Sequence, residues 1–243
     1  MIEQLRQRLQ ALQRTAGIAD GARALPLGIG TIDAALGGGL ARGALHEIAA
    51  PSEAHLAAAT GFVLGLSASS CDGRSCRLLW IAEDMALGES GAPYGPGLDT
   101  FGLAPERLLT VAAARPHELL WAMEEALRCR AVRAVIGEVR HGAIDMVALR
   151  RLSLAAAASG ALALLLRGAP SSEASTAATR WIVGAAPSTA ASPRFAAHLV
   201  RNRRGPLGSW ILEWSDSDER FLLATHAQPV AAPALDRPHR QVA

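Results

Sequence analysis

The chain has 243 residues, of which 50% are hydrophobic, so it can form one large domain, or one large and one small domain, around a substantial core. Its formal net charge is +2, which is too small to indicate a nucleic-acid-binding protein by itself. We find neither a basic and apolar leader nor an apolar run of membrane-spanning length, so we expect a cytoplasmic protein that does not enter a membrane.

The cysteines and histidines do not predict a metal site. Cys71, Cys76 and Cys129 are an odd number and lack the paired CxxC spacing of a zinc site, so we expect ordinary thiols in a reducing compartment. His46 and His55 have no third or fourth ligand at a suitable spacing. We therefore expect no metal.

The N-terminal region, residues 1–24, has a helical pattern followed by a linker. Ile2, Leu5, Leu9 and Leu12 recur at helical spacing among polar residues, which predicts an amphipathic helix. This helix either packs on its own domain or docks on a neighbouring subunit, in which case the protein would self-associate.

Residues 25–226 alternate between strand and helix patterns, which predicts an α/β core with a mainly parallel sheet and helices on both faces. The elements expected in chain order are a buried strand ending near Ile48, a helix over 56–70, a strand over 77–82, a Gly- and Pro-rich loop over 88–97, a strand over 108–112, a helix from Pro116 to about Arg130, a strand over 132–136 that stops at Gly137, a helix capped by Asp145, and a strand over 161–166.

The pattern changes in the last third of the chain. Four β-like runs without helices between them predict antiparallel strands added at the end of the sheet, at 179–184, 195–203, 209–214 and 220–225. Trp181, Trp210 and Trp214 lie at strand positions without interleaved basic residues, which favours a core role over base stacking. Residues 227–243 are rich in proline and alanine, and we expect a disordered tail there.

A long motif connects this layout to a known family. Residues 28–51 fit the pattern GxGxxDxALGGGLxxGxxxEIxxP and resemble the segment that leads into the P-loop of RecA-family recombinases. The resemblance covers roughly residues 25–225 and implies a RecA-like core.

The residues at the expected P-loop depart from the GxxxxGK[ST] pattern. Ala50 and His55 stand in place of the two glycines, Leu56 in place of the lysine, and Ala57 in place of the Mg²⁺-binding hydroxyl. Pro51 also lies in this loop, and the chain contains no lysine at all, while the planar fork of arginine does not replace a point charge. The sequence therefore predicts a degenerate nucleotide site, with no cofactor and no catalysis.

Two acidic residues lie where the active RecA family has functional carboxylates. Asp84 is nearest to the position of the water-activating residue, but the missing phosphate-binding loop favours a strand-end carboxylate that caps the next loop over a catalytic base. Glu138 follows the strand that resembles Walker B, and it is expected to pair with Arg140 or Arg150.

The densest basic cluster consists of Arg201, Arg203 and Arg204. Arg201 and Arg203 resemble the basic pair that reaches the nucleotide of a neighbouring subunit in the RecA filament. As alternate residues of a strand they should share one face, which is either a solvated sheet edge or a contact site for a partner's carboxylates.

The RecA-like core of this chain resembles the ImuA family. Residues 140–142 and 168–178 leave little room for the two DNA-binding loops of RecA, and the core ends in the segments 179–188 and 208–214, as in ImuA proteins. That resemblance implies DNA repair in the SOS response to DNA damage. The implied partners are an ImuB-type polymerase-like adaptor, RecA and an error-prone polymerase α-type subunit, and any contact with DNA is weak or indirect.

Two other functions stay open on the sequence. Some relatives carry a label that links them to the SulA cell-division inhibitor, so a SulA-like inhibitor is one alternative. A RecA-type DNA-dependent ATPase is the other, and the altered P-loop residues argue against it.

Overall fold

The computed structural model describes residues 24–71, 76–129, 131–188 and 192–224. The expected N-terminal helix with Ile2, Leu5, Leu9 and Leu12, and the tail at 227–243, lie outside these residues and stay predictions. Within the described residues, no helix is long and apolar enough to cross a membrane.

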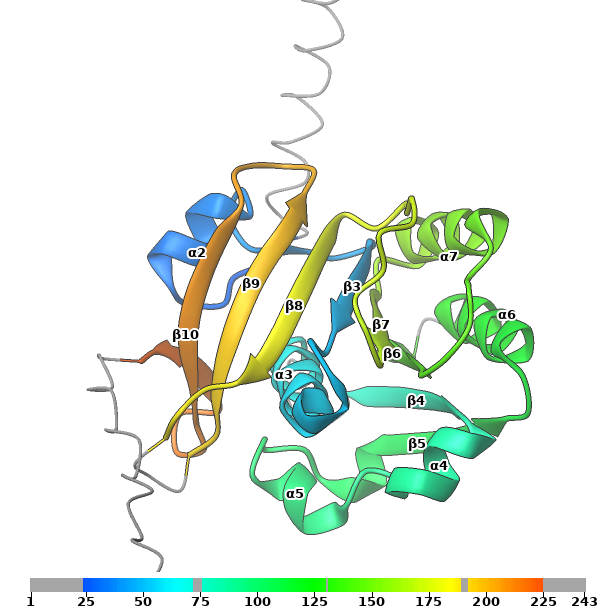
Figure 1. The fold of residues 1–243 in the computed structure, drawn as a ribbon, viewed down its shortest axis with the longest axis horizontal. Helices are drawn as coiled ribbons and strands as arrows, with labels where there is room; N and C mark the ends of the chain where they lie inside the picture. Colours follow the sequence, from blue (N-terminus) through cyan, green and yellow to red (C-terminus); the bar gives the residue numbers. More distant parts are fainter. Residues whose placement is uncertain (1–23, 72–75, 130, 189–191, 225–243) are drawn as a thin grey trace, which may run out of the picture.

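A nine-stranded mixed sheet organises the chain, with the strand order β11-β10-β9-β8-β3-β7-β6-β4-β5 (Figure 1). Its strands are β3 (Leu45–Ala49), β4 (Arg77–Glu83), β5 (Leu108–Ala113), β6 (Val132–Val139), β7 (Leu162–Arg167), β8 (Thr179–Ala185), β9 (Arg194–Asn202), β10 (Gly208–Ser215) and β11 (Arg220–Leu223). Neighbours pair in parallel in the part of the sheet formed by β8, β3, β7, β6, β4 and β5. They pair antiparallel in the part formed by β8, β9, β10 and β11. A separate two-stranded sheet joins β1 (Ala24–Leu25) to β2 (Leu40–Ala41).

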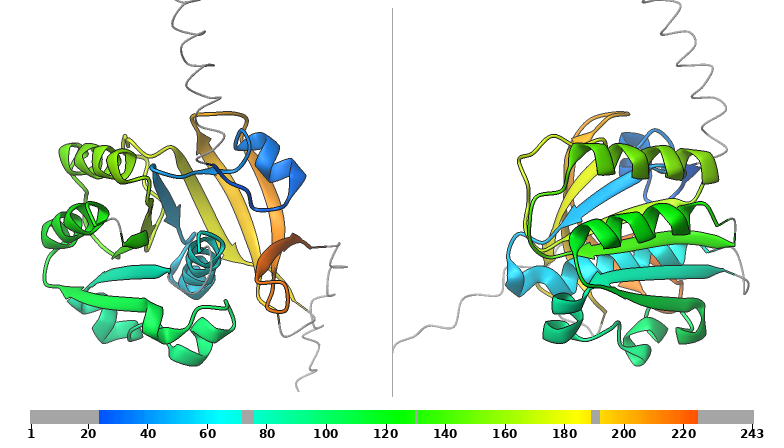
Figure 2. Two further views of the ribbon diagram at one scale, coloured as in Figure 1. Left: turned by 180° about the vertical axis from the view of Figure 1, so that it is seen from behind. Right: turned by 90° about the vertical axis from the view of Figure 1, so that its right-hand side faces the viewer.

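Helices cover the sheet on both sides. They are α2 (Gly30–Ala35), α3 (Leu56–Ser69), α4 (Asp84–Ser90), α5 (Gly95–Asp99), α6 (Pro116–Leu127) and α7 (Met146–Ser159). One face packs on α6 and α7, which lie side by side in the right-hand view of Figure 2. The other face packs on α3, and the residues of α2 belong to the same hydrophobic cluster. The predicted fold class, an α/β RecA-like core with a mainly parallel sheet and antiparallel strands at its C-terminal end, is confirmed.

Local sequence signals explain several element ends. Asp145 caps α7 by accepting a hydrogen bond from the backbone N–H of Val147 at 3.1 Å, and Gly160 ends this helix in the left-handed region at a φ of 76°. Pro116 occupies the first turn of α6, where a missing N–H costs nothing. These three predicted features are confirmed.

Three expectations about the elements are wrong. The run at 179–184 was expected to be purely antiparallel, but it forms β8, which pairs in parallel with β3 and antiparallel only with β9. This strand therefore connects the two parts of the sheet. The segment 88–97 is not simply a loop, since α4 extends through Gly88 and α5 starts at Gly95 with a proline in its first turn.

The third error concerns Gly137, which does not end its strand, since β6 continues to Val139. A Cβ atom built at Gly137 would lie only 2.2 Å from the sulfur of Met123 on α6. Glycine is therefore explained here by close packing between helix and sheet, and not by a turn.

The tryptophans of the C-terminal strands lie in the core, as predicted. Trp181 and Trp214 are fully buried, and the ring of the half-buried Trp210 lies 6.0 Å from that of Trp181. The indole N–H of Trp214 donates to the backbone carbonyl of Thr100 at 2.8 Å, which ties β10 to the segment after α5.

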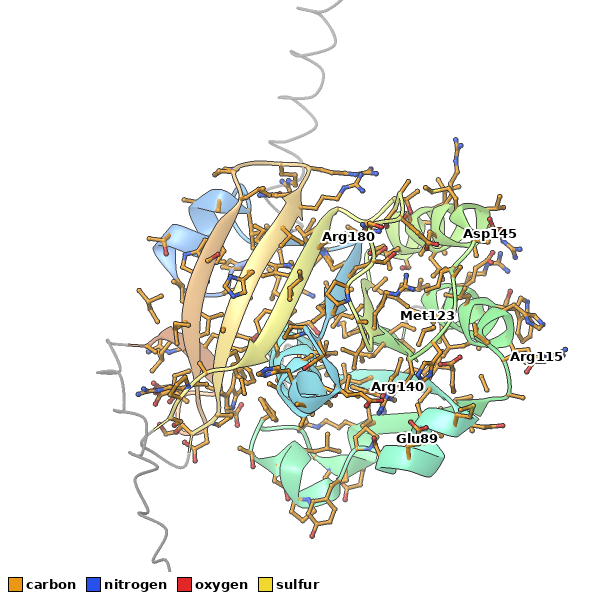
Figure 3. The ribbon with its side chains drawn as sticks, in the orientation of Figure 1. Glu89, Arg115, Met123, Arg140, Asp145 and Arg180 are labelled. Atoms are coloured by element: carbon orange, nitrogen blue, oxygen red, sulfur yellow. A yellow bond between two sulfur atoms is a disulfide. The ribbon has the colours of Figure 1, made fainter. Side chains whose placement is uncertain are left out.

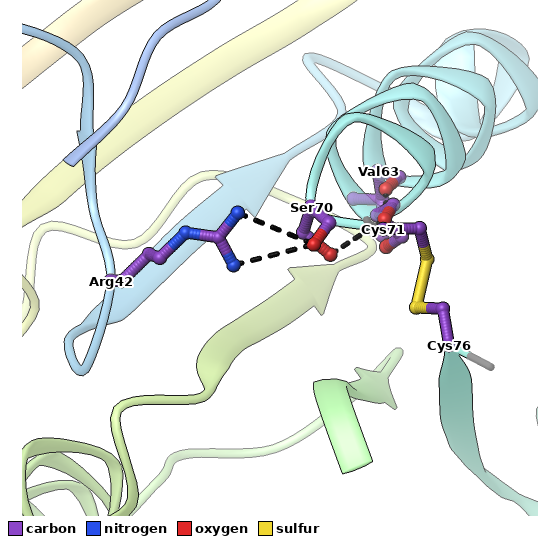
Figure 4. The surroundings of a disulfide bond; sticks show 6 residues. Arg42, Val63, Ser70, Cys71 and Cys76 are labelled. Carbon is purple, nitrogen blue, oxygen red and sulfur yellow. Dashed lines mark hydrogen bonds between the residues drawn. A yellow bond between two sulfur atoms is a disulfide. The ribbon is translucent and has the colours of Figure 1, made fainter. Parts of the chain in front are cut away.

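The expectation of three ordinary thiols is wrong for two of them. A disulfide joins Cys71 to Cys76 between the end of α3 and the start of β4, and Cys129 is free and exposed (Figure 4). The two Cα atoms lie 5.3 Å apart, within the range of a disulfide. Beside it the guanidinium of Arg42 donates to the carbonyl of Ser70 at 3.3 Å.

Candidate functional site

The predicted degenerate P-loop connects β3 to α3 at the carboxyl end of a parallel strand. In open α/β sheets, ligands bind at this edge, where loops follow the strand ends. The loop contains one 3₁₀ turn, Glu53–His55, and α3 begins directly after it at Leu56. The residues that depart from the P-loop pattern thus lie at the edge of the sheet where proteins of this fold class bind ligands.

The side chains of this loop make structural contacts. Leu56, at the position aligned with the lysine, is only 7% exposed and belongs to the main hydrophobic cluster, and it also lines the pocket described below. His55 accepts a hydrogen bond through Nδ1 from the backbone N–H of Ala185 at 3.0 Å, which fixes the loop to the end of β8. A Cβ at Gly184 would lie 3.2 Å from this imidazole and 3.3 Å from Pro51. The loop is packed against β8, and Ala57 and Glu53 are exposed beside it.

Glu138 belongs to a buried network with Arg140 and Trp80. One carboxylate oxygen accepts from Arg140 Nε at 2.8 Å and Nη2 at 2.7 Å, and the other accepts from the Trp80 indole N–H at 3.0 Å. The side chains of Glu138 and Arg140 are 8% and 9% exposed, so both charges depend on each other for compensation. Of the two predicted partners, Arg140 is the correct one.

Glu83, which the sequence reasoning passed over, joins the ends of two neighbouring strands. Its carboxylate accepts a hydrogen bond from the backbone N–H of Arg140 at 2.8 Å, whereas Asp84 is exposed in the first turn of α4. Glu83 is the first acidic residue after the apolar run of β4. An acidic residue at the end of a strand could have been predicted to contact the end of a neighbouring strand, because the parallel strands end beside one another at this edge of the sheet.

A pocket of about 770 Å³ lies between α3, β4 and the segment of α4 and α5. Glu53 and Ala57 line it from the loop side, Trp80 and Phe101 contribute apolar surface, and Glu138 and Arg140 lie at its polar side. Figure 3 labels Arg140 and Glu89 close to each other at this place, and their Nη1 and Oε2 atoms are 4.0 Å apart. This pocket thus adjoins the predicted degenerate P-loop.

His46 is buried in β3 and is bound on both ring nitrogens. Nδ1 lies 2.8 Å from Thr179 Oγ1, and Nε2 lies 2.9 Å from the carbonyl oxygen of Ala41. Burial lowers the pKa of His46 from 6.5 to about 4, the hydrogen bond to Ala41 opposes this, and the charge of Arg204 lowers it further. His46 is therefore neutral at physiological pH. No group of three or more possible metal ligands gathers in the part of the chain that the structure describes.

A second buried ion pair, which the sequence reasoning did not find, lies beside His46. Arg180 Nε donates to Glu47 Oε2 at 2.5 Å, with exposures of 14% and 5%, and Ser175 donates to the other carboxylate oxygen. Glu47 is part of the RecA-like motif, and its partners come from residues 128 and 133 positions later in the chain. Such a pairing has no local sequence signal.

The three clustered arginines have different environments. Arg201 lies in β9 directly opposite Arg180, and its side chain makes no hydrogen bond or ion pair with any residue that the structure describes. Arg203 follows the end of β9, and its guanidinium donates to the carbonyl of Ser175 at 3.2 Å. Arg204 is half-buried, and its backbone N–H donates to Asn202 at 3.0 Å.

The expected alternation of Arg201 and Arg203 within one strand is wrong. The pairing of β8 with β9 shifts register between Arg180 and Trp181, and β9 ends at Asn202. A strand fixes which side chains share a face only while its ladder continues.

Comparisons with known proteins agree with this architecture. The chain is 31% identical over 196 residues to Protein ImuA from two strains of Caulobacter vibrioides, covering 73% of this chain and 77% of each relative. A RadB recombinase has a similar fold, with a TM-score of 0.54 at 15% identity, covering 81% of this chain and 98% of that structure. No family model matches the chain.

Proposed function

The chain belongs to the ImuA family, and from this premise we propose that it is a non-catalytic, RecA-like accessory protein of damage-induced mutagenesis. In this proposal it supports error-prone translesion DNA synthesis in the cytoplasm as part of the SOS response. It acts through contacts with an ImuB-type polymerase-like adaptor, RecA and an error-prone polymerase α-type subunit.

The observation that carries the non-catalytic part is the environment of Leu56. A P-loop lysine must reach the β and γ phosphates, but the side chain at this position is buried in the core. Residues 50–57 contain no cation and no hydroxyl near the position of a Mg²⁺ ligand, since Ala57 stands there. Glu53 adds a negative charge next to the place where phosphates would bind.

The carboxylates near this loop give the same support. Both oxygens of Glu138 accept hydrogen bonds, one from Arg140 and the other from Trp80. A general base needs a free oxygen directed at the attacking water, and Glu138 has none. One oxygen of Glu83 accepts from the backbone N–H of Arg140, so both carboxylates hold the ends of β4 and β6 together.

A half-buried arginine supports a role in protein contacts. The side chain of Arg201 has no partner among the described residues, and the guanidinium fork engages carboxylates in a bidentate manner. The described stretch 168–178 contains no basic residue, which argues against strong DNA binding through this segment.

The experiment that tests the proposal is a pull-down of the tagged full chain from cells exposed to DNA damage, combined with a mutagenesis assay. We expect the polymerase-like adaptor to co-purify, and deletion of the gene to abolish damage-induced mutations until the gene is restored. A matched pull-down without DNA damage controls for constitutive association. Normal induced mutagenesis in the deletion strain would contradict the proposal. Recovery of a tubulin-like division protein in place of the adaptor would favour the SulA-like alternative.

A further inference from the structure

The pocket between α3, β4 and the α4–α5 segment combines apolar walls with an excess of negative charge. Leu64, Trp80 and Phe101 supply apolar surface, and carboxylates of Glu53, Glu89 and Glu138 line the polar side. Pockets of roughly 300–1,000 Å³ suit small ligands or a few side chains, and this pocket has about 770 Å³.

The charges of the pocket are unevenly compensated. The single lining cation, Arg140, is held by Glu138 at 2.7 Å and by the hydroxyl of Ser90 at 2.9 Å, so its charge is already neutralised. Glu89 is half exposed and lies 4.0 Å from Arg140. Glu53 forms no ion pair or side-chain hydrogen bond with any described residue. Two carboxylates are thus left to attract a cation at the mouth of an apolar cavity.

This arrangement disfavours phosphate and favours an amphipathic cation. A phosphate group would face Glu53 and Glu89 without a free cation to pair with. An arginine side chain has an aliphatic stem that packs on apolar surface and a charged end that binds carboxylates. Tyr94, which lines the pocket and is 75% exposed, can stack on such a guanidinium.

We infer that this pocket binds an arginine side chain, together with an adjacent apolar residue, from a peptide segment of a protein partner. The inference rests on the proposed function only in taking the occupant to be a protein. It identifies the chemistry of the contact, which the family relationship does not supply.

The test uses a defined probe, N-acetyl-phenylalanyl-arginine amide, titrated into the full chain. Binding is followed through the indole N–H resonances, because the N–H of Trp80 donates to Glu138 at the pocket wall. The matched probe contains citrulline, which has the same shape without the charge. We expect a saturable shift of the Trp80 signal by the arginine probe and affinity for the citrulline probe reduced by about tenfold, as for loss of a charge-assisted bond.

Two variants connect binding to the pocket. Ala57 is exposed and lines the cavity, so Ala57→Trp should fill it and abolish the shift. Ala54 is exposed in the preceding 3₁₀ turn, Glu53–His55, and does not line the cavity, so Ala54→Trp should leave binding unchanged. The double change Glu53→Gln and Glu89→Gln should weaken the arginine probe by about three- to tenfold, because exposed ion pairs contribute little each.

Equal affinity for both probes, or no shift at about 10 mM arginine probe, would overturn the inference, as would a Trp80 shift caused instead by Mg-ATP. The dispersion of the indole resonances in each variant shows that it is folded. The titration contains none of the proposed partner proteins. A negative titration therefore does not contradict the proposed function, and a negative pull-down does not contradict binding of the arginine probe.

Discussion

Protonation of His46 should couple the stability of the fold to pH. This imidazole is fully buried in β3, with bonds from its two ring nitrogens to Thr179 and Ala41. Burial is the main reason that the pKa of His46 is lowered to about 4. The folded protein therefore keeps the ring neutral under conditions in which the unfolded chain protonates it.

The direction and size of the effect follow from these two values. Between pH 6.5 and about 4 the unfolded state binds more protons, so the free energy of unfolding falls as the pH decreases through this window. The contribution of His46 to the free energy of unfolding is fully present above pH 6.5, which is the pKa of histidine in the unfolded chain. At about 1.4 kcal/mol per pKa unit, the total loss is about 3 kcal/mol, of which about 2 kcal/mol should be gone by about pH 5.

Urea unfolding of the wild type and of His46→Gln at about pH 7.5 and about pH 5 measures this contribution. The glutamine amide does not titrate, so the variant should lose about 2 kcal/mol less than the wild type on acidification. His198→Gln is the control, because His198 is exposed and its replacement should leave the wild-type drop unchanged. An equal drop in His46→Gln would refute the reasoning, since the titrating group would then lie elsewhere.

Three further predictions concern nucleotide, partner contacts and the N-terminal region. Isothermal titration with Mg-ATP should show no binding, because Leu56 and Ala57 offer neither the cation nor the hydroxyl of a P-loop, and micromolar affinity would contradict this. The double change Arg201→Ala and Arg203→Ala should weaken adaptor binding in a pull-down without lowering the melting temperature, whereas Arg150→Ala, at an exposed arginine of α7, should have no effect. Nanomolar binding of single-stranded DNA that this double change abolishes would instead indicate a DNA-binding protein. Replacing Leu5 and Leu9 with glutamate should reduce self-association or RecA binding in sedimentation experiments, and an equal loss of melting temperature in the monomer would assign this segment to the core.

Sequence periodicity predicted most of the fold because the relevant signals are local. The apolar runs of the parallel strands, the proline at the start of α6 and the Asp145 cap each depend on a few neighbouring residues. The direction of β8 could not be obtained in this way. Its parallel pairing with β3 joins residues 133 positions apart, and a short β-like run does not indicate which partner it has.

The site was predictable at the level of residue identity but not of contact. The sequence alone identifies Leu56 in place of a lysine, and the resemblance to RecA places this residue at the expected loop. The contact of Glu83 with Arg140, the ion pair of Glu47 with Arg180 and the disulfide depend on how the ends of strands and helices meet in space. Hydrogen-bond geometry of that kind has no periodic pattern along the chain.

The position of β3 in the sheet has a consequence for how the protein is made. Its two neighbours, β7 and β8, are translated more than a hundred residues after it. During synthesis α3 and β3 leave the ribosome long before β8, β9 and β11 arrive to cover their apolar surfaces, and non-local pairing of this kind forms slowly. A nascent chain stalled before Thr179 thus exposes Ile48 and Phe62, which are fully buried in the finished protein. Chaperone demand should therefore be greatest during translation of the middle third, and release should coincide with completion of the antiparallel strands.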